Sequence, residues 1–359
     1  MKREDIIYYS ENAEIDIWEK LLRYTYKKNI KSYFEDNLFE YNELIGEAIS
    51  GSISQAYEYF HASKVCTINT SPLMLYYGSI NLLFGISCLK TGKLLRVNSH
   101  GLSLVHSKTH SILEGKVSII NRSNAGFKEY HEGLFRNSLD NVDKSMSILN
   151  MILCIPEVAV DFIKNLPIQN VLMIPLNKIV LDDTSYYKVN KDMVSLTPEE
   201  EKEIVGRVIN LEANYFISFN NANEGLFTKK LNGKNMVKKS YYNEHYFSVD
   251  AELAKWEDID EYLIGFIALF ALSDICRYKP EIWNPFVKDD MTGELGIVEN
   301  FIRKMRRFFP NKVLDILEGG KHIFTNKLGQ DIDKRKMISE ENIKQIKQDI
   351  IKELGGTKR

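Results

Sequence analysis

The chain has 359 residues, of which 44% are hydrophobic and 27% are charged, and its formal net charge is -2. That length is enough for one large domain or two ordinary domains with a sizeable core. The nearly balanced charge argues against a strongly basic nucleic-acid-binding protein and against a polyanionic tail protein, while local basic patches stay open. The four cysteines show no C-x-x-C spacing, so we expect neither a thiolate metal site nor a redox motif.

The first 110 residues are predicted to be mainly helical, and 71–90 is their most apolar segment. Ser71 is predicted as the N-cap of this helix and Pro72 as its first residue, where the missing N–H costs nothing. Gly78 and Gly85 are seven residues apart and therefore share one helix face. Because a glycine inside a helix costs about 1 kcal/mol relative to alanine, we expect close packing against another backbone at this face.

The same segment is long enough to suggest a membrane span, but Asn81 and several serines and glycines within it argue against one. Residues 1–18 contain no apolar signal core. We therefore predict a cytoplasmic protein without a membrane partner, in which 71–90 is a buried helix.

The periodicity changes beyond residue 110. Residues 116–120 and 126–130 predict short strands around a turn at 121–124, and 210–220 alternates as a strand does. Helices are predicted again from residue 257 onward.

The sequence therefore predicts an α+β fold that is predominantly helical. Its expected parts are an N-terminal helical part, a mixed α/β insertion, C-terminal helices that pack on the N-terminal part, and a charged helical tail, at 1–110, 111–250, 251–324 and 325–359, respectively.

His100 is the strongest candidate for chemistry. It follows the apolar helix in a Ser99-His100-Gly101 turn, with Arg96 four residues before it. Histidine titrates near neutral pH and acts as a general acid or base, and arginine binds a phosphate or carboxylate through two hydrogen bonds. The structural alternative is a histidine that caps a helix end or bonds to a backbone carbonyl.

Arg277 ends the second apolar helix and shares a face with Ser273, Phe270 and Phe266. A guanidinium on an apolar face needs a partner, because an unpaired buried charge is very costly. The partner is either a ligand anion or a protein carboxylate, so a functional role and a structural ion pair both stay open. Trp283 is predicted to cover the guanidinium.

A basic cluster formed by Arg303, Arg306 and Arg307 is either a solvated helix face or a contact for RNA or a protein partner. His106 and His110 have the spacing of a helical metal site, but no acidic or cysteine ligand accompanies them, so no metal is expected. The chain contains no nucleotide-binding or hydrolase motif, and no cofactor is expected.

Three motifs occur in order along the chain. They are Pro72-Leu73-Met74-Leu75-Tyr76-Tyr77-Gly78, His100-Gly101, and Leu272-Ser273 followed by Arg277-Tyr278 and Trp283. In these motifs the chain resembles the YaaC-like family of bacterial proteins. The resemblance implies an architecture rather than a particular reaction. We predict Tyr77 and Trp283, together with the three arginines of the basic cluster, as binding residues.

The N-terminal helices are also similar, more distantly, to the HEPN helical bundles of prokaryotic RNases and of toxin or antiphage systems. HEPN nucleases place an arginine and a histidine a few residues apart at a dimer interface, and Arg96 and His100 have a shorter separation. This similarity implies a HEPN-like helical core with a small inserted β-containing region.

Two functions are therefore considered. The first is a binding or interaction protein of a bacterial stress or antiphage defence pathway, with a protein partner or a homodimer, in which His100 and Arg277 are structural or hold a small anionic ligand. The second is a metal-independent HEPN-type endoribonuclease, in which His100 is the general acid or base and Arg96 or Arg277 stabilises the charged phosphate. RNA or a nucleotide is the expected alternative to a protein partner. Both functions require the two apolar helices to pack together and to bring His100 near Arg277.

Overall fold

A computed structural model describes residues 5–107, 111–135, 139, 145–162, 172–181, 184–189, 197, 199, 216–219, 225–228, 237–248, 256, 259–290 and 292–326. The chain divides into two compact units, which are described separately. Unit 1 comprises Met1–Val158 and Asp258–Phe324, and unit 2 comprises Ala159–Glu257 and Thr325–Arg359. The structure is mainly helical with short strands, which confirms the predicted α+β, predominantly helical class.

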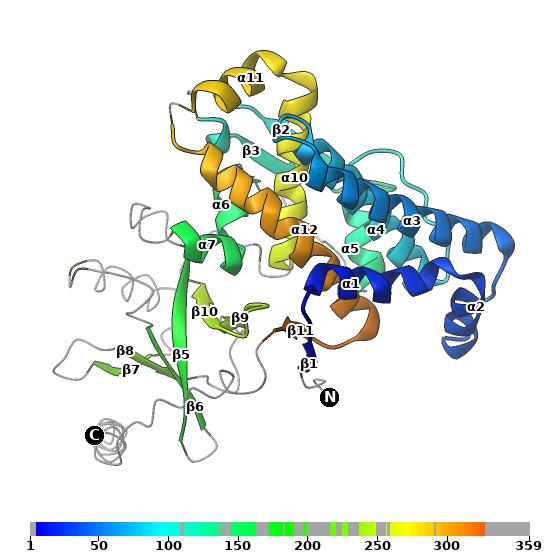
Figure 1. The fold of residues 1–359 in the computed structure, drawn as a ribbon, viewed down its shortest axis with the longest axis horizontal. Helices are drawn as coiled ribbons and strands as arrows, with labels where there is room; N and C mark the ends of the chain where they lie inside the picture. The colour runs from blue at the N-terminus through cyan, green and yellow to red at the C-terminus, as the bar shows by residue number, and fades with distance from the viewer. Residues whose placement is uncertain are drawn as a thin grey trace. The chain divides into compact units, whose positions relative to one another are not determined.

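Unit 1 is built from helices around one apolar core (Figure 1). Its helices include α1 (Ala13–Leu22), α2 (Lys27–Asp36), α3 (Glu43–Val65), α4 (Ser71–Thr91), α5 (Gly126–Phe135), α6 (Ile148–Leu153), α10 (Glu261–Tyr278), α11 (Pro280–Asp289) and α12 (Leu295–Glu318), with the 3-10 turns η1 (Arg23–Thr25) and η2 (Ile112–Glu114). Helix α7 (Pro156–Phe162) contains the boundary to unit 2.

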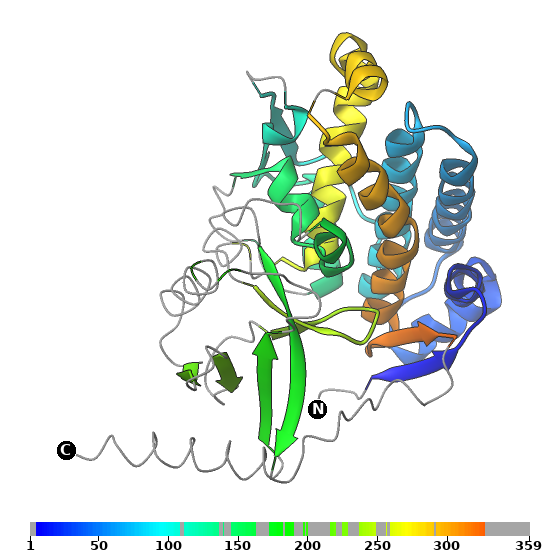
Figure 2. The same cartoon turned by 60° about the vertical axis from the view of Figure 1, so that its left-hand side comes forward.

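Two small sheets complete unit 1. In one, β1 (Ile6–Tyr9) pairs with β11 (His322–Thr325), so the two ends of the unit lie side by side (Figures 1 and 2). In the other, β3 (Lys116–Ile119) lies between β2 (Leu102–Val105) and β4 (Ser145–Ser147), with antiparallel pairing on both sides.

Helices α3 and α4 pack side by side, and glycine permits their close approach (Figure 2). A Cβ atom added at Gly78 would lie 2.7 Å from Cδ2 of Phe60, and one added at Gly85 would lie 3.0 Å from Cγ1 of Ile53. The close packing expected at the glycine face of α4 is thereby confirmed. By length and composition α4 could cross a membrane, but 67% of its most apolar window is buried inside the structure, as in a core helix.

The start of α4 differs from the prediction by one residue. Thr70 is the N-cap, and Ser71 is the first helical residue. The Ser71 hydroxyl donates to the carbonyl oxygen of Ser63 at 2.9 Å instead of capping its own helix. A backbone carbonyl of the preceding helix α3 therefore replaces the local capping bond that the sequence suggested.

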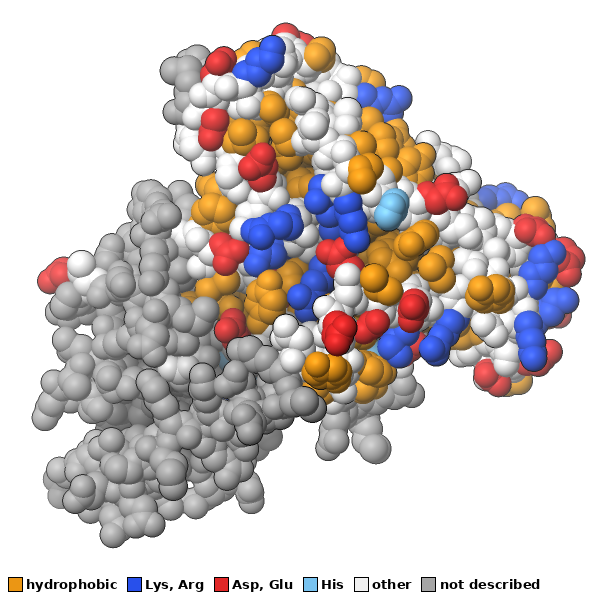
Figure 3. All heavy atoms as spheres, in the orientation of Figure 1, with side chains coloured by type: hydrophobic (Ala, Val, Ile, Leu, Met, Phe, Trp, Pro, Cys, Tyr) orange, Lys and Arg blue, Asp and Glu red, His pale blue; other side chains and the backbone are white. Residues whose placement is uncertain are grey.

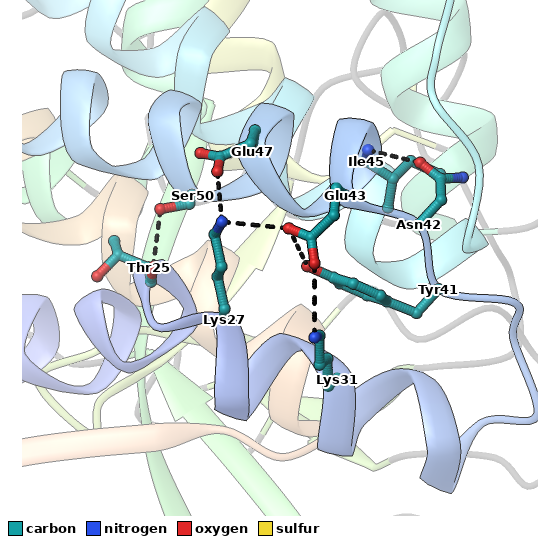
Figure 4. A network of polar contacts seen from close by, with 9 residues as sticks. All are labelled: Thr25, Lys27, Lys31, Tyr41, Asn42, Glu43, Ile45, Glu47 and Ser50. Carbon is teal, nitrogen blue, oxygen red and sulfur yellow. Dashed lines mark hydrogen bonds and ion pairs between the residues drawn. The ribbon is translucent and has the colours of Figure 1, made fainter.

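An exposed ion-pair network joins α2 to the start of α3 (Figure 4). The Lys27 ammonium lies 3.1 Å from a Glu43 oxygen and 2.6 Å from a Glu47 oxygen. Asn42 caps α3 by accepting a hydrogen bond from the backbone N–H of Ile45 at 3.0 Å. Because the charged side chains are about half exposed or more, these ion pairs contribute little, and the cap contributes about 1 kcal/mol.

The prediction for 116–120 is confirmed by β3, but the prediction of a strand at 126–130 is wrong, because these residues begin α5. The buried residues Phe127, Tyr130 and Leu134 follow a helical spacing that becomes visible only over the longer segment. The mixed part also has a later start than predicted, since unit 2 begins at Ala159 rather than at residue 111. The small sheet of β2, β3 and β4 packs with the helices of unit 1.

Unit 2 contains a sheet of antiparallel neighbours in the order β7-β8-β6-β5-β10-β9. Its strands are β5 (Met173–Leu181), β6 (Thr184–Val189), β7 (Phe216–Phe219), β8 (Gly225–Thr228), β9 (Val237–Lys239) and β10 (His245–Ser248). Ile174 of β5 and Phe247 of β10 are partners in the register and are both buried. The helical tail was predicted for 325–359, where Thr325 instead ends β11 and residues 327–359 lie outside the described residues.

Candidate functional site

The two apolar helices α4 and α10 pack against each other through aromatic side chains. The ring of Tyr76 on α4 lies 5.5 Å from that of Phe266 and 5.8 Å from that of Phe270, both on α10. Phe266 also stacks with Phe127 of α5 and with Phe309 of α12, each at 6.2 Å. The predicted packing of the early and late apolar helices is thereby confirmed, and it brings the ends of both helices together.

His100 is fixed by the backbone on both sides of its turn. Its carbonyl oxygen accepts the N–H of Phe127 at 3.0 Å, and the carbonyl of Gly101 accepts the N–H of Ile120 at 2.8 Å. Gly101 has a φ of +73° and packs against Ala125, where a Cβ atom would approach to 3.0 Å, so a larger residue is disfavoured there. The turn therefore holds the His100 side chain in a defined place.

The imidazole of His100 is anchored by a side chain of α4. Its Nδ1 lies 2.9 Å from the Tyr76 hydroxyl, and its ring lies 5.8 Å from that of Phe270. The residue is nevertheless exposed. A histidine held through Nδ1 presents its Nε2 as the nitrogen left for a ligand or for proton transfer.

Arg277 lies at the end of α10 and is exposed. Its Nη1 donates to the Tyr77 hydroxyl, and its guanidinium lies over the ring of Tyr278, 4.7 Å from the centroid. Among the described residues, Arg277 forms no ion pair with a carboxylate. The sequence allowed a ligand anion or a protein carboxylate as the partner of Arg277, and the structure instead places two tyrosines beside it, which orient the guanidinium.

The electrostatics of the site favour a neutral imidazole. Partial burial lowers the pKa of His100, Asp274 acts to raise it, and Arg277 acts to lower it further. Burial also raises the pKa of the Tyr76 hydroxyl, which stays protonated. Because both Asp274 and Arg277 act on His100, the three groups share one neighbourhood, in which His100 is neutral at pH 7.

The other predicted residues do not join this cluster. Arg96 is exposed, and its side chain makes no hydrogen bond or ion pair with a described residue. Trp283 is buried against Phe286 with ring centroids 5.5 Å apart, so the ring that covers Arg277 is Tyr278 instead. Pro280 starts a new helix, α11, and the sequence does not predict how this helix is oriented. In the structure Trp283 lies on its buried face.

The basic cluster of α12 is divided by the fold. Arg303 is exposed, whereas Arg306 is half-buried and donates to the carbonyl of Ser63. Arg307 donates to the carbonyl of Phe324 at 3.1 Å. The three arginines therefore form no common surface, and only Arg303 and Arg306 line a cavity together.

Three residues of the site were not singled out from the sequence. Tyr76 lies within a recognised motif, but only its contact with His100 shows that it positions the imidazole. Asp274 lies three residues before Arg277 on α10, and this helical spacing was the available signal for it. Tyr278 follows Arg277 directly and lies within a recognised motif, but only its ring contact shows that it covers the guanidinium. Among the described residues no group of three or more His, Cys, Asp or Glu is arranged for a metal ion, and His110 lies outside those residues.

Comparison with known proteins gives one match. The model of the family described as YaaC-like Protein matches residues 14–317, which is well over half of the chain and includes His100 and Arg277. No curated protein and no solved structure matches the chain. The chain therefore belongs to the YaaC-like protein family.

Proposed function

We propose that this YaaC-like protein binds a nucleotide or single-stranded RNA at the surface formed by His100, Arg277 and Tyr278. The observation that carries the proposal is the state of Arg277, which is exposed, held by Tyr77 and Tyr278, and without an ion pair among the described residues. A guanidinium that is oriented but not neutralised is suited to a phosphate, which it binds through two parallel hydrogen bonds.

Tyr278 supports a nucleotide rather than a simple anion. Its side chain is 58% exposed, and its ring lies beside the group that would hold the phosphate. Exposed aromatic rings stack on nucleobases irrespective of sequence, with about 1–3 kcal/mol per base. The negative charge of Asp274 close to His100 favours a single phosphate next to Arg277 over a dense polyanion.

In this proposal the protein acts as the binding component of a bacterial stress or antiphage defence pathway. A protein partner or a second copy of the chain would respond to the bound state. The family match supports neither the pathway nor the partner, so both are part of the proposal.

Arg277→Ala is expected to weaken binding of a fluorescein-labelled single-stranded RNA by about tenfold or more. The expected loss corresponds to about 1.5–3 kcal/mol for hydrogen bonds to a charged group. Fluorescence anisotropy measures the affinity. The salt concentration is held constant because phosphate contacts depend on it, and unlabelled AMP is the competitor.

The matched control is Arg23→Ala, which removes an exposed arginine of η1 whose side chain makes no hydrogen bond among the described residues. This variant should bind the RNA as the unmodified protein does. Equal affinities of the Arg277→Ala and Arg23→Ala variants would exclude the proposed site.

A second candidate function is a metal-independent endoribonuclease with a HEPN-like helical core. It is favoured by His100, whose exposed imidazole is neutral near pH 7 and is oriented by Tyr76, as a general base requires. Arg277 would then stabilise the charge on the phosphate during cleavage.

For this alternative, His100→Ala is expected to abolish cleavage of single-stranded RNA in the presence of EDTA. A general base works only when neutral, so cleavage should decline as the pH falls through the His100 pKa, which lies below its usual value of 6.5. Gel-based cleavage assays between pH 5 and 8 measure both effects. Undiminished cleavage by the His100→Ala variant would rule out this role.

A further inference from the structure

A second feature of unit 1 is an open cavity between the start of α4 and the N-terminal half of α12. Its volume is about 400 Å³, within the range of small-molecule sites. Figure 3 shows Lys and Arg side chains gathered over α12 on the face in view. The walls of the cavity include Ile68, Ser71, Glu299, Ile302, Arg303 and Arg306. None of these residues belongs to the surface of His100, Arg277 and Tyr278.

Arg306 is held rigidly at this cavity. Its Nη2 donates to the Ser71 hydroxyl at 2.7 Å and to the carbonyl of Ser63, and the Ser71 hydroxyl donates to the same carbonyl. The side chain is therefore fixed before any ligand arrives, which reduces the ordering cost of binding.

Among the described residues, no carboxylate forms an ion pair with Arg306. Burial lowers its pKa, while Glu14, which is ion-paired with Lys64, acts electrostatically to raise it. The Nε atom of Arg306 is enclosed and has no hydrogen-bond partner among the described residues. Because this partly desolvated guanidinium has no direct counter-ion, an anion in the adjoining cavity would compensate its charge.

Arg303 lies three residues before Arg306, so both side chains reach the same side of α12. It is exposed and forms no ion pair or hydrogen bond with a described residue, including Glu299, which lies one helical turn earlier. The cavity walls therefore carry two guanidinium groups and one carboxylate, which gives them a net positive charge. The side chains of Ile68 and Ile302 add an apolar wall.

We propose that this cavity binds a phosphomonoester, with its phosphate held by Arg303 and Arg306 and its organic part against Ile68 and Ile302. Arginine pairs match the several oxygens of a phosphate, whereas the apolar wall distinguishes an organic phosphate from the inorganic ion. The proposal does not depend on the nucleotide surface at Arg277.

Isothermal titration calorimetry with glycerol 3-phosphate, at constant chloride and in a phosphate-free buffer, tests the proposal. Saturable binding is expected for the unmodified protein, with weaker saturable binding of inorganic phosphate. Arg303→Ala is expected to reduce the affinity for glycerol 3-phosphate about tenfold or more. Arg303 forms no hydrogen bond or ion pair with a described residue, so the Arg303→Ala variant should have the same thermal unfolding temperature as the unmodified protein.

Arg306→Lys is the second variant, because it keeps the charge but loses the planar fork that reaches Ser63 and Ser71. It is also expected to bind glycerol 3-phosphate more weakly. Arg23→Ala, which removes an exposed arginine of η1 outside both proposed sites, is the control and should bind it as the unmodified protein does.

Three outcomes would overturn the proposal. The first is an absence of saturable heat with the unmodified protein, and the second is an Arg303→Ala variant that binds as tightly as the unmodified protein. The third is a loss of glycerol 3-phosphate binding in Arg277→Ala alone, which would place the ligand at the other surface. The RNA affinities of the same variants separate the two sites, because only Arg277→Ala should weaken RNA binding.

Discussion

Phe266→Ala is expected to lower the free energy of unfolding by about 3–5 kcal/mol, the largest effect of a single truncation foreseen for unit 1. Phe266 is 1% exposed and stacks with Tyr76, Phe127 and Phe309, which come from α4, α5 and α12. Removing its ring leaves a cavity where α10 contacts the other helices. Because these aromatic contacts hold the helices together, the surrounding side chains cannot collapse fully into the space.

Urea unfolding followed by far-ultraviolet circular dichroism measures this loss. Leu44→Ala is the control, since Leu44 is 69% exposed on α3 and its truncation should change the stability by no more than about 0.5 kcal/mol. A loss of stability below about 1 kcal/mol for Phe266→Ala would contradict the prediction that this ring holds the helices of unit 1 together. The same variant should weaken RNA binding, because Tyr76 both packs on Phe266 and positions His100.

Raising the pH from 7 to 10 is expected to destabilise unit 1 through His322. Its side chain is fully buried, with Nδ1 3.0 Å from Asp315 Oδ1 and Nε2 2.9 Å from Glu318 Oε2, and its ring stacks on Tyr8 at 5.7 Å. Burial lowers the pKa of His322, but the hydrogen bonds that its ring N–H groups donate to Asp315 and Glu318 outweigh this effect and raise the pKa to about 9.

The sign follows from the raised pKa. A histidine with a pKa of 6.5 when unfolded and about 9 when folded binds its proton more tightly in the folded state. Its stabilising contribution is complete below pH 6.5 and is lost as the pH rises through 9. At about 1.4 kcal/mol per pKa unit, the contribution is on the order of 3 kcal/mol.

His322→Gln is expected to remove most of this pH dependence and to cost about 3–5 kcal/mol at pH 7, because Asp315 and Glu318 lose the positive charge between them. Urea unfolding at pH 6, 7.5, 9 and 10 measures both effects. His61→Gln, at an exposed position on α3, is the control and should behave as the unmodified protein. If His322→Gln still loses as much stability between pH 7.5 and 10 as the unmodified protein does, groups other than His322 cause the pH dependence.

The candidate site was partly predictable because two of its residues follow directly from strong local patterns. Arg277 lies in the last turn of α10, and His100 follows the end of α4 in a turn that packs against Tyr76, near the start of the same helix. Apolar helices of one domain pack together. The partners of His100 and Arg277 were not predictable in the same way. Tyr76 and Tyr77 are adjacent in sequence, yet one bonds to His100 and the other to Arg277. That choice depends on how α4 is rotated against α10.

The basic cluster shows the same limit. Arg306 and Arg307 are neighbours in sequence but reach different carbonyls, those of Ser63 and Phe324. Adjacent helical residues point about 100° apart, so a run of arginines need not form one surface. Only the contacts of α12 with the start of α4 show that Arg303 and Arg306 line the same cavity.

The sequence by itself determined the helical class of the protein, the extents of its apolar core helices, and the places of Arg277 in the last turn of one helix and of His100 after the other. Hydrophobic periodicity and helix-start signals act over a few residues, which is why a sequence shows them. The tertiary structure decided that Tyr278 rather than Trp283 covers Arg277, that α5 replaces a strand, and that unit 2 begins at Ala159. These outcomes depend on which faces of distant segments are buried against each other, and that choice minimises exposed apolar area over the whole unit.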